Sequence, residues 1–383
     1  MKTFIVSCLL CSLGGLLSSC AGEAREADVE GADEALRAPR LQPIVDRLVE
    51  ESGAPGAIVG VSRAGQRALF ASGVDELLLG IPLSPERVFR AGSLIKLLTA
   101  ALVLQLVEQK QLRLDDKLSQ WVPSFPNAAA ITLEMLLSHT AGVTTRWFDD
   151  PELQQSLLLD LTREFAPREV IEMASAWEPV GAPGEVGMHY SNVGYILLGE
   201  VIARVLGRPY EEVLEQRLLQ PLGLGDTSYA LSSVPGLAHG YHELASVPLD
   251  VSVLPQASFL SMAGAAGALH TTASDMLRFM HLLFETGRVV TPQTRTRMLT
   301  EVAAGSGYGL GVMLLCPCSS DGKAPHPGGF GHGGHVPGYW SLAAYFPDKR
   351  LSVVIAINAD AARGALLDRS SLDAALARIY ETL

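Results

Sequence analysis

Strand-like segments lie near both ends of this chain, and helical patterns fill the long region between them. Residues 57–62 and 67–72 are short β-type runs joined by a tight turn, which indicates a hairpin. Runs rich in β-branched and aromatic residues return at 308–315, 339–346 and 351–358. A doubly wound parallel sheet needs strands that alternate with helices, so this order argues against one. It predicts an α+β fold (mixed α/β) in which both ends of the chain build one antiparallel sheet.

The helical patterns divide into a terminal pair and a middle group. Residues 41–52 and 372–382 carry apolar side chains at helical spacing, and we expect these helices to flank the sheet. A long helix that is apolar on nearly every face is expected from about 93 to 108. Further helices are expected at 170–177, 193–206, 210–219 and 274–284. The middle of the chain therefore forms an inserted, mainly helical lobe, and its boundary with the sheet is a natural place for a cleft.

Length and charge narrow the class of protein. The 383 residues are enough for one large domain with an inserted lobe. The net charge of −12 provides no basic surface of the kind that nucleic acids require, so we expect no nucleic-acid partner.

The N-terminus has the pattern of an export signal. Lys2 precedes an apolar run from Phe4 to Leu17, which is too short to span a bilayer. The run ends in Leu-Ser-Ser-Cys at Cys20, which resembles a bacterial lipobox. We therefore expect a lipoprotein signal peptide at 1–19 and a lipidated Cys20. An ordinary signal peptide with an incidental cysteine, or a buried helix, is the alternative.

Residues 20–40 are expected to form an acidic, flexible tether, because they carry many carboxylates and few large apolar groups. The folded part would then be exported and held at a membrane through Cys20, facing the periplasm or the cell exterior. Two other cysteines, Cys316 and Cys318, lie in the folded part. They are either unpaired or bonded to each other, since two thiolates do not make a metal site.

The first chemical motif is Ser93-Leu-Ile-Lys96 at the start of the long helix. Residues three apart share a helix face, so the hydroxyl and the amine can come within hydrogen-bond distance. A desolvated lysine can accept the serine proton and activate the hydroxyl as a nucleophile. The alternative is a helix-capping Ser93 with Lys96 reaching toward solvent, but a lysine that enters so apolar a helix needs a reason.

The second motif is Tyr190-Ser-Asn192. A phenol near an ammonium ionises more easily and can exchange protons with the serine or the leaving group, while the Asn192 amide can orient the lysine and bind a substrate amide. In the alternative, Asn192 only caps the next helix and Tyr190 is only packed.

The third motif is a glycine-rich run that contains His332, Gly333, Gly334 and His335. Glycines let a backbone approach a ligand closely, and the main-chain N–H groups of His335 and Ser93 can form an oxyanion hole. Zinc binding by His326, His332 and His335 is the less favoured alternative, because no carboxylate pattern accompanies them.

In this order and at these separations, the three motifs SLIK, YSN and HGG resemble those of the serine β-lactamase and penicillin-binding-protein superfamily. The nearest branch contains class C β-lactamases, D-alanyl carboxypeptidases and related esterases. The phrases LLSHTAGV and AAGALHTTASDMLRF agree with this resemblance, although we interpret His139 in the first phrase as a packed, hydrogen-bonded residue. The resemblance covers residues 41–383. It implies a five-stranded antiparallel sheet, formed by 41–92 and 300–383, with a helical lobe at about 93–299.

The resemblance also implies roles for individual residues. Ser93 would be the nucleophile, Lys96 its proton acceptor and Tyr190 the acid/base partner. Substrate contacts would come from the other motif residues: Asn192, His332, Gly333, Gly334 and His335. Gly333 departs from the family pattern, because a threonine or serine hydroxyl is common there and helps to hold a substrate carboxylate. Esterase-like members of the superfamily also lack this hydroxyl, so the resemblance leaves amide versus ester specificity open.

The sequence thus predicts a serine hydrolase that works through an acyl-enzyme on an ester, amide or lactam, with a small-molecule or peptidoglycan-like substrate and no metal or organic cofactor. One rival is a non-catalytic envelope lipoprotein that binds peptidoglycan-like ligands. A zinc hydrolase is another.

Overall fold

The computed structural model describes residues 36, 38–144, 150–185, 187–244, 247–315, 328–362, 365–366 and 370–383. The expected signal peptide, Cys20, nearly all of the expected tether and the pair Cys316 and Cys318 lie outside the described residues. Within the described part of the chain, no helix is long and apolar enough to cross a membrane.

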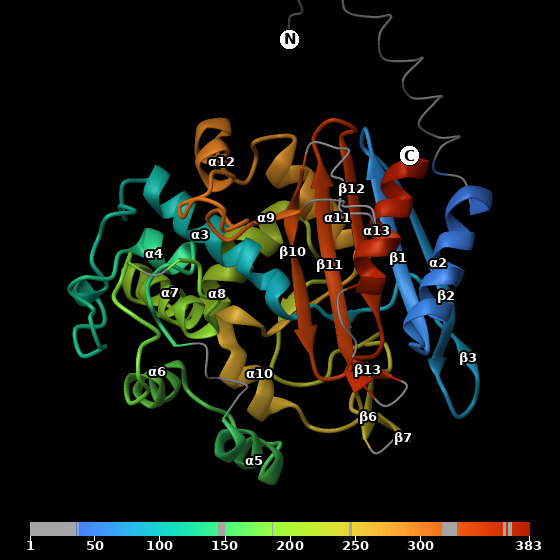
Figure 1. Cartoon of the computed structure of the whole chain (residues 1–383), viewed down its shortest axis with the longest axis horizontal. Coiled ribbons are helices and arrows are strands. Elements are labelled where there is room, and N and C mark those ends of the chain that lie inside the picture. The colour runs from blue at the N-terminus through green and yellow to red at the C-terminus, as the bar shows by residue number, and fades with distance from the viewer. Residues whose placement is uncertain are drawn as a thin grey trace, which may run out of the picture.

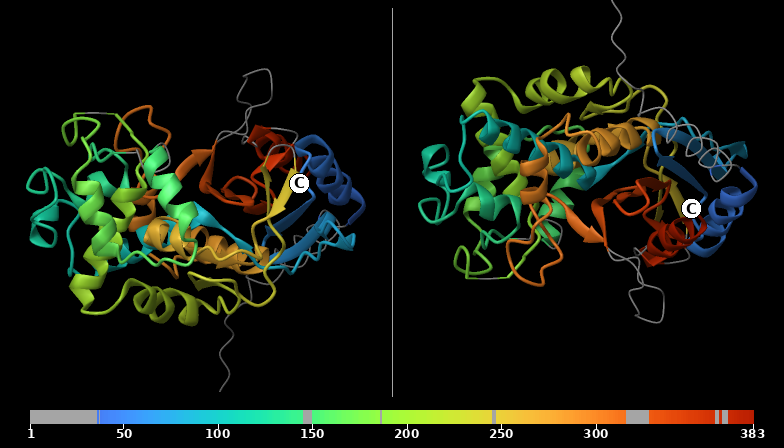
Figure 2. Two further views of the ribbon diagram at one scale, coloured as in Figure 1. Left: turned by 90° about the horizontal axis from the view of Figure 1, so that it is seen from below. Right: turned by 90° about the horizontal axis from the view of Figure 1, so that it is seen from above.

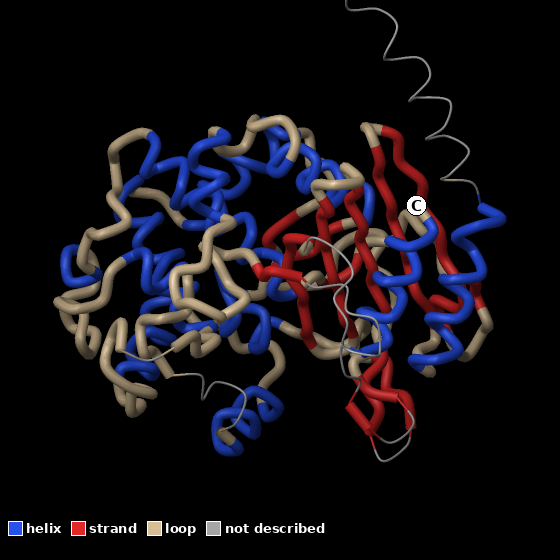
Figure 3. Tube along the Cα trace, turned by 45° about the horizontal axis from the view of Figure 1, so that its top comes forward, coloured by secondary structure: helices blue, strands red, loops and turns tan. Residues whose placement is uncertain are grey.

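One antiparallel sheet forms the strand-rich side of the molecule, as Figures 1 and 3 show. Its strand order is β3-β2-β1-β12-β11-β10-β9. The strands are β1 Gly56–Arg63, β2 Gln66–Glu76, β3 Ile81–Pro82, β9 Met313–Leu315, β10 Gly329–Val336, β11 Tyr339–Phe346 and β12 Leu351–Ile357. The mixed fold with an antiparallel sheet is confirmed. The five long strands lie in the centre, and the very short β3 and β9 add one strand to each edge.

Alternate residues of the central strands face two different helical layers. Val59 and Ile355 pack in one core with the terminal helices α2 (Ala38–Ser52) and α13 (Ser370–Thr382). Their sequence neighbours Ile58 and Val354 belong to a second core, which includes the apolar face of α11 (Ala273–Phe284). Because successive side chains of a strand point to opposite faces, the sheet lies between these layers, and α2 and α13 lie side by side (Figures 1 and 2).

The helical lobe lies beyond β10 and β9, on the other side of the molecule from α2 (Figure 1). Its helices are α3 Ile95–Glu108, α4 Leu133–Leu137, α5 Pro151–Leu159, α6 Pro167–Ser175, α7 Asn192–Leu206, α8 Tyr210–Leu214, α9 Gln220–Leu222, α10 Ala257–Ala263 and α12 Pro292–Met298. Short strands complete the described elements: β4 Phe89–Arg90, β5 Ser228–Tyr229, β6 Tyr241–Leu244, β7 Val247–Asp250, β8 Leu269–Thr271, β13 Ala361–Ala362 and β14 Ala365–Leu366. The two lobes meet where α3 begins.

Several expected elements differ in detail. The helix expected at 41–52 begins at Ala38, so 38–40 are helical and not part of a flexible tether. The helix expected at 210–219 is α-helical over Tyr210–Leu214 and a π-helix over Glu215–Leu219.

The expected helix at 93–108 begins as a 3₁₀ turn, Gly92–Leu94, and becomes α-helical at Ile95. The expected strand at 308–315 is a strand only at Met313–Leu315, because Gly311 takes a left-handed conformation with φ of 76°.

Strand β10 was not predicted, because four of its eight residues are glycine and glycine is depleted in strands. The packing explains this composition. A Cβ at Gly331 would lie 1.9 Å from the Ala343 carbonyl oxygen, so a larger residue would push β10 away from β11.

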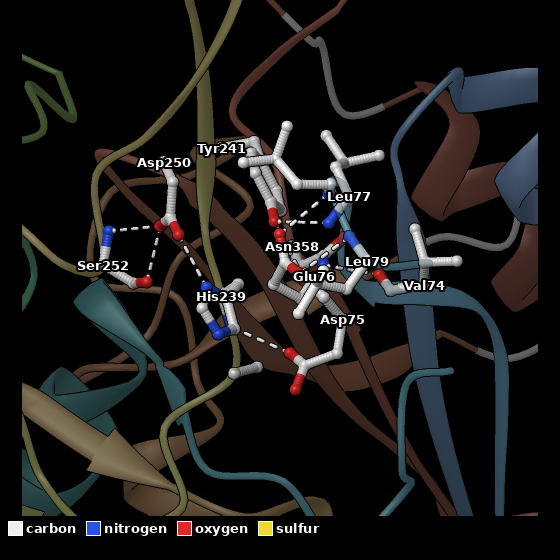
Figure 4. A network of polar contacts seen from close by, with 12 residues as sticks. Val74, Asp75, Glu76, Leu77, Leu79, His239, Tyr241, Asp250, Ser252 and Asn358 are labelled. Carbon is white, nitrogen blue, oxygen red and sulfur yellow. Dashed lines mark hydrogen bonds and ion pairs between the residues drawn. The ribbon is translucent and has the colours of Figure 1, made fainter. Parts of the chain in front are cut away.

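A partly buried polar network, centred on the buried Asp75, anchors the segment from Ala238 to Ser252 to the sheet (Figure 4). The Asp75 carboxylate, at the end of β2, pairs with Arg87 at 2.5 Å and accepts the backbone N–H of His239 at 2.8 Å. The His239 ring donates to Asp250 at 2.6 Å, and the Ser252 hydroxyl donates to the same carboxylate at 2.5 Å. The Asp75–His239 bond joins segments 164 residues apart and attaches the 238–252 segment to the end of β2, at the lower end of the sheet in the view of Figure 1.

Candidate active site

Ser93 and Lys96 meet at the start of α3. Ser93 lies in the 3₁₀ turn and Lys96 in the first turn of the α-helix, so both side chains point to the same side. Lys96 Nζ lies 2.9 Å from Ser93 Oγ. The spacing expected from the motif is therefore present, and the lysine does not reach toward solvent, since its side chain is fully buried.

The surroundings of Lys96 favour a neutral amine. Nζ donates to the Asn192 side-chain oxygen at 2.8 Å and to the Ala266 carbonyl at 2.7 Å. Within the described residues, it forms no ion pair with a carboxylate. Burial without a counter-charge disfavours the ammonium and lowers the pKa of Lys96 well below its ordinary value. The amine can therefore accept the proton of Ser93.

Tyr190 lies on the loop that leads into α7, and its ring is 4.9 Å from Lys96 Nζ. Burial raises the pKa of the Tyr190 phenol above its ordinary value, and a hydrogen bond with Ser93 opposes this only in part. The expectation that the nearby lysine makes this phenol easier to ionise is therefore not met, because Lys96 itself is desolvated. Tyr190 is positioned as a proton donor.

Asn192 begins α7 and points toward Lys96. The helix cap is Ser191, whose hydroxyl accepts the backbone N–H of Gly194 at 3.2 Å. Because Ser191 performs the capping, the Asn192 amide is available for Lys96, and the alternative in which Asn192 is only a cap is wrong.

The free edge of β10 faces Ser93. Strand β9 pairs with β10 only at Gly329, Phe330 and Gly331. Further along, a Cβ on Gly92 would lie 3.0 Å from the backbone nitrogen of His335 and 3.1 Å from its carbonyl oxygen. Gly92 also has a φ of 54°, so glycine is needed there on both grounds. The main-chain groups of His335 are thus directed to the turn that holds Ser93, which is the arrangement an oxyanion hole needs.

The two adjacent glycines of the third motif differ in the space around them. A Cβ at Gly334 would lie 2.0 Å from the Ala91 carbonyl oxygen and 2.5 Å from Ser341 Oγ. A Cβ at Gly333 would meet only the Ser341 carbonyl oxygen, at 3.8 Å. Gly334 is therefore required for close packing against the Ser93 turn, whereas Gly333 leaves room for a side chain.

The two histidines of β10 lie apart from each other. His332 is fully buried, with Nδ1 2.5 Å from the Gly333 carbonyl oxygen and Nε2 2.9 Å from the Tyr308 hydroxyl. His335 is exposed, stacks on Trp340 and lies 3.6 Å from Asp360. Residues three apart on a strand face opposite sides. No group of three metal-ligating side chains occurs in the described ranges, which do not include His326.

An aromatic wall around Lys96 was not recognised from the sequence. Its rings are those of His139, Tyr190, Tyr195, Tyr308 and His332, with neighbouring centroids 4.4 to 6.1 Å apart. Tyr195 lies one helical turn after Asn192, so its spacing was a usable signal. Tyr308 had none. This wall keeps water from the amine.

Comparison with known proteins agrees with this geometry. A family model described as Beta-lactamase matches residues 41–376. Penicillin-binding protein 4 of Amycolatopsis lactamdurans is 27% identical over 345 residues, which cover 84% of this chain and 86% of that protein. Esterase EstB of Burkholderia gladioli is 29% identical over 224 residues, covering 55% of this chain and 56% of the esterase. The solved structure of D-amino acid amidase from Ochrobactrum anthropi SV3 is similar with a TM-score of 0.76 and 25% identity, covering 90% of this chain and 97% of the amidase.

The contrast between the two glycines is testable. We expect Gly334→Ala to lower kcat/KM by about 100-fold, because a shift of about 1 Å between β10 and the Ser93 turn is enough for such a loss. Gly333→Ala, which adds the same methyl group, should lose much less. The measurement is kcat/KM for p-nitrophenyl acetate, with circular dichroism to check folding. Equal losses in two folded variants would contradict the steric argument.

Proposed function

This chain belongs to the Beta-lactamase family and is a serine hydrolase of amide or ester bonds, and we propose that Ser93 is its nucleophile. The observation that carries the proposal is the buried, uncompensated amine of Lys96 at 2.9 Å from Ser93 Oγ. A ligand-binding lipoprotein without catalysis has no use for such an amine, and burying it costs stability. The non-catalytic alternative is therefore less favoured.

Acylation begins when Ser93 Oγ attacks the substrate carbonyl carbon and its proton passes to Lys96 Nζ. The carbonyl oxygen becomes an oxyanion, which accepts hydrogen bonds from the backbone N–H groups of Ser93 and His335. When the bond to the leaving group breaks, Tyr190 donates its proton to that group. The ammonium of Lys96 then returns the serine proton to the phenolate, and the site is neutral again.

Deacylation uses the same groups with water as the nucleophile. Water gives a proton to Lys96 and attacks the acyl carbon, and the second tetrahedral intermediate is held in the same oxyanion hole. The bond to Ser93 Oγ breaks as that oxygen regains a proton, and a carboxylic acid is released. No step needs a metal or an organic cofactor.

We further propose that neutral, activated esters are better substrates than β-lactams or D-alanyl peptides. At position 333, where the family resemblance leads us to expect a threonine or serine hydroxyl, this chain has glycine and open space. His332 does not replace that hydroxyl, because it is buried and contacts Tyr308 and Gly333. The likeness to an esterase supports this choice.

We also propose that the enzyme is an exported lipoprotein, with residues 1–19 removed, Cys20 lipidated and the domain facing the periplasm or the cell exterior. The support is the sequence pattern at Cys20 and the acidic segment that follows it. A substrate at the cell envelope, small or peptidoglycan-like, is consistent with this location.

Replacing the nucleophile should abolish covalent labelling. We expect Ser93→Ala to form no adduct with a fluorophosphonate probe, since among the described serines only Ser93 has its hydroxyl within hydrogen-bond distance of Lys96 Nζ. Lys96→Met, which keeps an unbranched side chain one atom shorter but removes the base, should react about 100-fold to 10,000-fold more slowly. Intact-protein mass spectrometry measures both. An undiminished adduct in Ser93→Ala would show that the assignment is wrong.

Restoring a hydroxyl should change specificity. A charge-assisted bond to a substrate carboxylate contributes about 1.5–3 kcal/mol, or roughly 10-fold to 150-fold in rate. We expect Gly333→Thr to raise the ratio of kcat/KM for a β-lactam to that for an ester, by up to this factor. Gly333→Val has the same shape without the hydroxyl and should not raise it. If the wild type already prefers the β-lactam, or if both variants behave alike, the argument from the missing hydroxyl fails.

The anchor is tested by Cys20→Ser in the native host. We expect this variant to leave the membrane fraction or to stay unprocessed, because the acyl chains that hold the protein would be absent. Fractionation and immunoblotting measure the distribution. Normal cleavage with unchanged membrane association would show that Cys20 is incidental.

A further inference from the structure

The loop that carries Tyr190 has little regular structure of its own. Between α6 and α7 the described residues form neither helix nor strand. The loop is held instead by backbone bonds to one short segment: Val180 N–H to Gly142, Gly184 N–H to Thr140 and His189 N–H to His139, at 2.8 to 3.0 Å. The position of the Tyr190 phenol therefore depends on residues 139–142.

His139 makes two of the contacts nearest to Tyr190. Its carbonyl oxygen accepts the N–H of His189 at 2.8 Å, and its ring Nδ1 accepts the N–H of Ser191 at 3.0 Å. The N–H groups on either side of Tyr190 thus both donate to one residue. The His139 ring also packs on the Tyr190 ring, with centroids 4.4 Å apart.

The backbone of His139 is itself unusual. It has a φ of 59°, in the left-handed region that non-glycine residues rarely adopt, and its side chain is buried. This conformation directs both the carbonyl oxygen and the ring toward the Tyr190 loop. Local strain of this kind persists only where surrounding contacts enforce it, and it is common at functional sites.

We propose that His139 is a positioning residue for the hydrolase, which holds the backbone on both sides of Tyr190 and thereby fixes the phenol against Ser93. The inference rests on the catalytic role of Tyr190 proposed above. His139 does not touch the reacting atoms. It acts through Tyr190, and its ring must be neutral to do so, because a protonated Nδ1 cannot accept the N–H of Ser191.

The environment of the ring maintains the neutral form. The groups that face it are Lys96 from α3, Tyr190 from the loop, Tyr195 from α7, Tyr308 from the segment before β9 and His332 from β10. Burial lowers the pKa of His139 well below its ordinary value, and nearby Lys96 and His332 lower it further. With Nδ1 as an acceptor, the remaining proton is on Nε2.

Two substitutions of His139 that match each other in shape distinguish the hydrogen-bond acceptor at Nδ1 from the packing of the ring. Asparagine and leucine have the same branched shape, but only asparagine offers an oxygen at the position of Nδ1, and it tolerates a left-handed backbone. We expect His139→Leu to lower kcat/KM for p-nitrophenyl acetate by about 10-fold to 100-fold. His139→Asn should stay within about 3-fold of the wild type, because it can still accept the Ser191 N–H. His139→Gly, which suits the backbone, replaces the leucine variant if that one does not fold.

A double-mutant cycle with Tyr190→Phe distinguishes positioning from general support. If His139 acts through the phenol, His139→Leu should cost less than about 3-fold in kcat/KM once the phenol is absent. A full additional loss in the Tyr190→Phe background would overturn the inference. If Tyr190→Phe alone retains wild-type kcat/KM, the proposed role of Tyr190 fails instead, so the two failures are distinguishable.

The pH dependence of stability gives an independent measurement. The folded pKa of His139 lies below the unfolded value of about 6.5, so the unfolded state binds more protons as the pH falls through that value. The free energy of unfolding of the wild type should therefore decrease below about pH 6.5. The decrease should be less steep in His139→Asn, because this variant lacks the proton that the unfolded wild type takes up at residue 139. Burial also lowers the pKa of His270, to about 3, but this contribution is common to both proteins and cancels. Identical slopes in urea denaturation would contradict a neutral His139.

Discussion

A buried amine without a counter-charge is the interaction on which the rest of this structure depends. Lys96 Nζ is removed from water and contacts a hydroxyl, an amide oxygen and a backbone carbonyl. A carboxylate in any of these places would hold the ammonium form and remove the base. The apolar surface of α3 and the aromatic wall maintain the desolvation. The groups around Lys96 Nζ thus form hydrogen bonds with it without carrying a charge.

The other half of the site depends on backbone rather than side chains. Gly92 and Gly334 allow the Ser93 turn and β10 to approach each other more closely than any residue with a Cβ would permit. The main chain of His335 then faces Ser93, the proposed nucleophile, from a strand edge that β9 leaves unpaired. Because an oxyanion hole needs donors that are already in place, the rigid sheet and the buried start of α3 are suited to supply them.

The sequence was sufficient to predict helices and strands whose apolar residues follow a clear pattern. The apolar spacing of residues 41–52 predicted a terminal helix, and the run at 351–358 predicted a central strand. Strand β10 was missed because its glycines hide the strand pattern. Gly334 is required by a contact with the distant Ala91, and Gly331 by one with Ala343 on the neighbouring strand β11. Ser93 and Lys96 were recognisable because one helix fixes their spacing. The ionisation of Tyr190 was misjudged, since proximity to a lysine says nothing about whether that lysine is charged.

The protonation states of the site have a common consequence for the substrate. Burial lowers the pKa of Lys96 and raises that of Tyr190, and both shifts disfavour a formal charge beside Ser93 in the resting site. The partners of these two residues are hydroxyl, amide, carbonyl and aromatic groups, which offer little attraction to a carboxylate. A substrate that carried a carboxylate would lose hydration on entering and gain no charge-assisted bond at Gly333. A neutral ester loses less hydration and still uses every group that the proposed chemistry needs, so the desolvated amine is consistent with the ester preference that we propose from Gly333.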